Sequence, residues 1–119
     1  MPAKTSDVTE LYRYLSPRAN GLLSVRSNGE IYRKTPFSSK WSLYATKRST
    51  TSMDEWIEKR MSVERNLKFW QRVQKLPSEK TLQRFMFDGV AESTAGNTVE
   101  PDGWDDEGSP SWLLALGMI

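Results

Sequence analysis

The sequence predicts a small α+β protein in which a three-stranded antiparallel sheet packs beside one long helix and three short helices. Two runs of strand composition flank an Asn-Gly pair near residue 28. Apolar residues recur with helical spacing over 53–75, and Pro and Gly residues punctuate the chain on both sides. A chain of 119 residues is long enough for one domain with at most a short appendage.

The first element expected is a short amphipathic helix over residues 7–15. Its apolar residues follow the spacing of one helix face, at Val8, Leu11, Tyr12 and Leu15. Ser6 is a suitable N-cap, and Ser16-Pro17 and Asn20-Gly21 then stop the helix.

Three strands should follow, over 22–26, 31–35 and 40–47. The first two are joined through Asn28-Gly29, and such a pair supplies the two positive-φ residues of a type I′ hairpin turn. In the third, apolar and polar residues alternate.

The longest helix is expected over 53–75, opened by a capping box of Ser52 and Glu55. Most of its apolar residues fall on one half of the helix. Phe69, Val73 and Leu76 fall on the opposite half, so the end of the helix is either enclosed on two faces or kinked. Pro77 ends it, and Ser78 caps a second helix over 79–87.

The C-terminal third divides into a linker and a terminal helix. The expected domain is 1–89, followed by an acidic linker over 90–108 with a loop at 90–103. Ser109-Pro110 should start a short apolar helix within 109–119, with Gly117 just past its end.

Charge is divided unevenly along the chain. Residues 1–88 carry all 17 Lys and Arg against 9 acids, a net charge of +8, whereas residues 89–119 carry 6 acids and no base. Such asymmetry indicates a polyanionic partner, an electrostatic switch, or both.

The chain lacks Cys and His, which removes the ordinary devices of nucleophilic catalysis and of imidazole or thiolate metal binding. Glu10, Glu30, Asp54 and Glu55 could hold Mg²⁺ as an alternative, but their spacing is not that of a metal site. We therefore expect no enzyme activity, no cofactor and no metal. No apolar run suits a membrane span or a signal peptide, so a cytoplasmic protein without membrane contact is the expectation.

Basic residues interleaved with aromatic residues predict nucleic-acid binding, because cations neutralise phosphates and flat rings stack on unpaired bases. The alternative interpretation is an ordinary sheet with aromatic side chains inside and basic ones in water. The candidate residues are Arg26, Tyr32, Arg33, Lys34, Lys40, Trp41, Lys47, Arg48, Arg65, Lys68, Arg72, Lys75, Lys80 and Arg84.

Two helical features extend this prediction. Arg65, Lys68, Arg72 and Lys75 would line one stripe of a continuous helix. The segment 76–85 resembles the recognition helix of helix–turn–helix proteins, which implies DNA reading by its polar residues. A plain helical corner is the alternative.

A different class of function is also open, namely a mobile-element-type module that modulates a host protein. It would act through its aromatic surface and an apolar C-terminus made of Trp112, Leu113, Leu116, Met118 and Ile119. The same residues could instead pack on the protein's own core. The acids before them could lie over the basic surface and compete with nucleic acid.

Overall fold

The computed structural model describes residues 8–119 and shows an α+β fold. One sheet has four antiparallel strands in chain order, and a second has two. The strands are β1 (Glu10–Ser16), β2 (Gly21–Arg26), β3 (Glu30–Lys34), β4 (Ser42–Thr46), β5 (Ala91–Glu92) and β6 (Thr98–Val99). The helices are α2 (Met53–Arg65), α3 (Glu79–Asp88) and α4 (Trp112–Ala115), with 3-10 turns η1 (Pro17–Ala19) and η2 (Phe69–Arg72). The α+β class is confirmed, and the expectation of three strands is wrong.

The extra strand is β1, where a helix was expected over 7–15. Its sequence also has a period of two, and Tyr12 and Tyr14 pack with the core residues of one sheet face. Pairing of β1 with β2 gives hydrogen-bond partners to the backbone N–H and C=O groups of both strands. A helix at this position would leave the groups on the outer edge of β2 without partners. The cap predicted at Ser6 lies outside the described residues.

The β2–β3 hairpin does not have the type I′ turn. Gly29 has a φ of +90°, but Asn20 is the single non-glycine residue with positive φ in the described chain, so Asn28 is not left-handed. Gly29 donates its backbone N–H to the carbonyl of Arg26 at 3.3 Å. The loop between β2 and β3 thus has three residues, and only the last, Gly29, is left-handed. This is the pattern of a hairpin in which a type I turn is followed by a glycine bulge.

The long helix ends ten residues earlier than predicted, at Arg65. The Asn66 side chain donates to the carbonyl of Ser62 at 2.9 Å, and Lys68 is extended. One straight helix would place Trp56 and Trp70 on the same half and Val73 on the opposite half, whereas the break directs the residues that follow it to a different core. Trp56 packs against the sheet, whereas Trp70 and Val73 reach a second core.

The break also removes the helical corner and the helix–turn–helix. Residues 66–78 separate α2 from α3 and include η2, so a three-residue turn does not join the two helices. The expected α3 is confirmed, with Ser78 accepting from the Thr81 N–H at 3.1 Å and Gly89 left-handed at its end.

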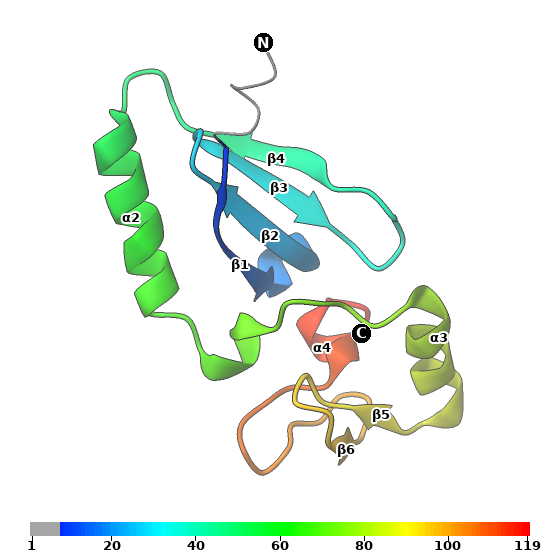
Figure 1. Cartoon of the computed structure of the whole chain (residues 1–119). Helices are drawn as coiled ribbons and strands as arrows, with labels where there is room; N and C mark the ends of the chain where they lie inside the picture. The colour runs from blue at the N-terminus through cyan, green and yellow to red at the C-terminus, as the bar shows by residue number, and fades with distance from the viewer. Residues whose placement is uncertain (1–7) are drawn as a thin grey trace.

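Two cores lie on the two faces of the four-stranded sheet. Leu23, Val25 and Ile31 face α2 and its Trp56. Leu15 and Leu22, on the other face, join α3 and α4 through Leu82 and Leu113. Figure 1 shows α2 beside the sheet and α4 between the sheet and the β5–β6 hairpin.

The C-terminal segment has regular structure where a loop was predicted over 90–103. The strands β5 and β6 pair, and single bridges join Ser93 to Ser111 and Trp104 to Pro110. The N-cap of the last helix is Ser111, which accepts from the Leu114 N–H at 3.1 Å, and not Ser109. Pro110 is taken up in the bridge, which delays the start of the helix.

Candidate nucleic-acid interface

One end of the sheet face opposite α2 is polar, and we call it the open face. Arg13 of β1 lies opposite Ser24 of β2, which lies opposite Tyr32 of β3, so the three form one row across the sheet. Side chains alternate along a strand, so this row and its neighbours two residues away point away from Val25 and Ile31. The open face comprises the bases Arg13, Arg26 and Lys34, the acids Glu10 and Glu30, the aromatic residues Tyr32 and Trp41, and the fully buried Ser24.

Arginine and aromatic side chains pair on this face. The guanidinium carbon of Arg26 lies 4.3 Å from the centre of the Tyr32 ring, and that of Arg13 lies 5.1 Å from the Trp41 ring. Both distances are within cation–π range. The face thus presents planar groups that also carry positive charge.

Glu10 holds this layer together. Its carboxylate accepts from the Ser24 hydroxyl at 2.5 Å and from Arg13 Nε at 3.0 Å. Burial raises the pKa of Glu10, but these hydrogen bonds and the charges of Arg13 and Arg26 outweigh it, and the pKa is lowered overall. A phosphate that binds either arginine must therefore compete with Glu10.

A cleft of about 630 Å³ adjoins the open face. The β3–β4 loop forms one wall and the segment leading to α3 forms the other. Its lining includes the bases Arg13, Lys34 and Lys75, and the aromatic residues Phe37 and Trp41. Phe37 is 57% exposed, so its ring is available to a ligand. Glu79 is the one acid in the lining.

The structure gathers only five of the fourteen predicted nucleic-acid residues at this site. Arg26 and Tyr32 lie on the open face, Lys34 and Trp41 lie on the face and in the cleft, and Lys75 lines the cleft. Lys40 is exposed in the same β3–β4 loop.

The other predicted residues are scattered. Arg33 points to the opposite face and donates to the carbonyl of Ala19 at 2.7 Å. Lys47 donates to the carbonyl of Thr51 at 2.7 Å, and Arg72 pairs with Glu64 at 2.6 Å. Because α2 ends at Arg65, the predicted basic stripe of a continuous helix does not form. The remaining residues are Arg48 after β4, Arg65 in α2, Lys68 after α2, and Lys80 and Arg84 in α3.

Arg13 and Phe37 belong to the basic and aromatic region over 11–50 that predicts nucleic-acid binding, but neither is among the fourteen candidate residues. Arg13 was placed in a helix, where it would not align with Ser24 and Tyr32. The alternation of Tyr12 and Tyr14 with Arg13 was the signal for a strand. Phe37 is one of the aromatic residues interleaved with the bases, but its place in the cleft depends on the path of a loop, which the sequence does not give.

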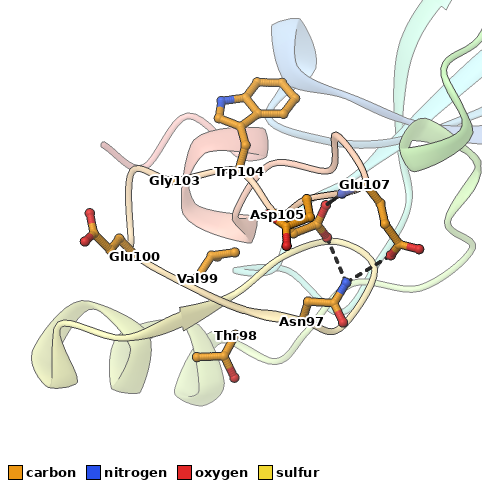
Figure 2. Close-up of a pocket in the computed structure, with 9 residues that line it drawn as sticks. Asn97, Thr98, Val99, Glu100, Gly103, Trp104, Asp105 and Glu107 are labelled. Atoms are coloured by element: carbon orange, nitrogen blue, oxygen red, sulfur yellow. Dashed lines mark hydrogen bonds between the residues drawn. The ribbon is translucent and has the colours of Figure 1, made fainter.

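A second cleft, of about 670 Å³, lies on the acidic C-terminal segment. Asp105 organises it by accepting hydrogen bonds from Ser93 Oγ, Asn97 Nδ2 and the backbone N–H groups of Glu107 and Ser109. Figure 2 shows Asn97 bridging Asp105 and Glu107. The hydrogen bond from Ser93, followed by those from Ser109 and Asn97, lowers the pKa of Asp105 to about 2.

The acidic segment does not neutralise the basic body through ion pairs. In residues 8–119 the ion pairs join Arg13 to Glu10, Arg65 to Glu58 and Arg72 to Glu64. Each pair lies before residue 73, so the expected cover of acids over the basic surface is not seen as direct pairing.

The predicted partner-binding tail contributes to the protein's own core. Trp112, Leu113 and Leu116 are buried together with Leu15 and Leu22. Met118 packs partly against this core, and Ile119 is exposed. Buried side chains have no surface to offer a partner while the protein stays folded.

Comparison with family models, curated proteins and solved structures finds no match to the chain. In the part of the chain that the structure describes, no helix has the length and apolar character needed to cross a membrane. Function must therefore be inferred from the site.

Proposed function

We propose that the protein is a non-catalytic accessory or regulatory protein that binds nucleic acid on the open face and in the adjoining cleft. The observation that carries the proposal is the pairing of Arg26 with Tyr32 and of Arg13 with Trp41 beside a cleft lined by Lys34 and Lys75. Planar rings next to cations stack on bases and contact phosphates at the same time. The proposed location is the cytoplasm, where a nucleic-acid partner would be accessible.

The site suits a single strand better than a duplex. A sheet face with aromatic side chains binds unstacked bases, whereas reading duplex DNA requires an element that enters the major groove. The helix predicted for that role does not follow a tight turn, because residues 66–78 intervene between α2 and α3. Stacking on one aromatic ring is worth about 1–3 kcal/mol per base.

The test is a binding titration with single-stranded DNA and single-stranded RNA of about 12 nucleotides, and with duplex DNA of about 12 base pairs. We expect tighter binding of a single strand and a loss of affinity between about 50 and about 200 mM salt. Lys34→Gln should weaken binding and reduce the salt slope by about 0.7, the value for one phosphate contact on a single strand.

Arg65→Gln is the matched control, because Arg65 is an exposed base on α2 that pairs with Glu58 at 3.6 Å. It should leave affinity and slope unchanged. Absence of salt-sensitive binding in the unmodified protein, or equal losses in the two variants, would refute binding at this site.

The alternative, a module that acts on a host protein through its apolar C-terminus, loses its main support because Trp112, Leu113 and Leu116 are buried. Capture of one protein that persists at high salt, without binding of any nucleic acid, would favour it over our proposal.

A further inference from the structure

The two edges of the four-stranded sheet are treated differently by the fold. At the β1 edge, Gln74 Nε2 donates to the Arg13 carbonyl at 3.3 Å, and Arg13 Nη1 donates to the Gln74 carbonyl at 3.2 Å. Gln71 Nε2 donates to the Leu15 carbonyl at 3.4 Å. The segment around η2 therefore covers this edge and satisfies part of its backbone.

The β4 edge has no such cover among the described residues. The strand is last in the sheet order and pairs only with β3, and all five of its residues are exposed. Figure 1 shows β4 along the outer side of the sheet. Lys47 donates its backbone N–H inward to the Gly29 carbonyl at 2.7 Å, so the alternation of an antiparallel ladder directs the Thr46 N–H outward.

The composition of β4 does not protect it. Exposed edge strands are usually blunted by a charged residue or a proline, because unpaired N–H and C=O groups recruit other strands. The strand reads Ser-Leu-Tyr-Ala-Thr and has neither. A register shift opposite Tyr32 bends it, yet Leu43 remains 54% exposed.

The charges around this edge select the occupant. Residues 33–53 contain five bases and no acid, with Lys40 just before β4, and Lys47 and Arg48 just after it. Glu30, which lies opposite Thr46 on β3, is the nearest acid by register. Antiparallel pairing of two copies would bring these basic ends together, and like charges across strands are destabilising. A segment with acidic ends has the complementary pattern.

We propose that β4 binds an extended, acid-flanked segment of a partner protein as a fifth strand of the sheet. Backbone hydrogen bonds would supply affinity, and Lys40 and Arg48 would contact the acidic ends. This edge is separate from the open face, so the inference does not rest on the proposed nucleic-acid function.

The probe is the synthetic peptide Glu-Asp-Val-Thr-Val-Thr-Val-Asp-Glu, followed by NMR of the isotope-labelled full chain. We expect shift changes centred on residues 42–48 and new protection of the Thr46 amide from hydrogen exchange. The same peptide with alternate backbone N-methyl groups, and one with Lys in place of its acids, should bind about tenfold or more weakly.

Thr46→Pro removes the outward donor without removing a bond to β3, and it should weaken binding about tenfold or more. Thr46→Val keeps the N–H and should bind like the unmodified protein. Thermal melts of both variants establish that each is folded.

Several results would overturn the proposal. Binding of the peptide by Thr46→Pro with unchanged affinity is one such result. Shift changes confined to Tyr32 and Trp41 are another. A third is single-stranded DNA that, in the absence of peptide, itself protects the Thr46 amide from exchange and displaces the peptide from the edge. Protection of the Thr46 amide in the free protein, or a dimer in sedimentation, would show that the chain or a second copy already occupies the edge.

Discussion

The guanidinium of Arg26 lies over the ring of Tyr32, with 4.3 Å between its central carbon and the ring centre. The Tyr32 hydroxyl donates to Glu30 at 3.1 Å, and this hydrogen bond is the main cause of a raised pKa for Tyr32. The phenol is therefore neutral in the physiological range. A guanidinium plane held over a neutral ring offers a base a stacking surface and a phosphate a cationic contact at adjacent positions.

Tyr32→Leu should weaken binding of single-stranded nucleic acid, because it removes a stacking surface and the support of Arg26. We expect a loss of about 5- to 150-fold, the equivalent of about 1–3 kcal/mol for one stacked base. Fluorescence anisotropy with a labelled oligonucleotide measures it. The control is Phe87→Leu, which removes a ring that is 89% exposed on α3. Equal affinity of the Tyr32 variant and the unmodified protein would contradict the stacking role.

Local signals predicted several elements well. The β2, β3 and β4 strands, the caps at Ser52 and Ser78, and the left-handed Gly89 follow from alternation and capping chemistry that act within a few residues. What failed depended on distant partners. The residues of β1 fit a helix or a strand, and only pairing with β2 decides between them.

The same limit applies to the candidate site. The basic and aromatic composition of residues 11–50 was visible, but the strand pairing decides which side chains share a face. Tyr32 and Arg33 are neighbours in the sequence and lie on opposite faces, so one joins the open face and the other binds the Ala19 carbonyl. The end of α2 at Arg65 disperses the rest.

Gly29→Val should lower the melting temperature. Its φ of +90° is unfavourable for a β-branched residue, and an added Cβ would lie 3.2 Å from the Lys47 Cβ. The cost should be about 1–2 kcal/mol. Asn28→Ala tests the type of turn, because Asn28 has no positive φ and should cost less. Comparable losses of melting temperature at the two positions would show that the turn is type I′ after all.

Leu113→Ala should destabilise the fold, because Leu113 of α4 is fully buried in the core that α4 shares with Leu15 and Leu22 of the sheet. Truncating such a leucine costs about 2–5 kcal/mol. Ile119→Ala, at a side chain that is 54% exposed, should have little effect. Urea unfolding of the two variants compares them. If the Leu113 variant were as stable as the unmodified protein, the terminal segment would not be needed for the core, and its interpretation as a partner-binding tail would be favoured.

Asp105 should make the acidic segment sensitive to low pH. Its pKa is about 2 in the folded protein against an ordinary value of 3.8, so the unfolded chain binds its proton first as the pH falls. The stability that Asp105 contributes is therefore complete above a pH of about 4 and is lost as the pH falls towards about 2.

Asp105→Asn should lower the melting temperature at neutral pH, because an amide cannot accept from all four donors. The difference between this variant and the unmodified protein should shrink across that pH window. Near-ultraviolet circular dichroism, which reports on the packing of the aromatic side chains, including Trp104 and Trp112, follows the transition. Asp102→Asn is the control, since Asp102 is exposed on the same segment. A difference that stays constant down to a pH of about 2 would show that Asp105 acts through shape and not through its charge.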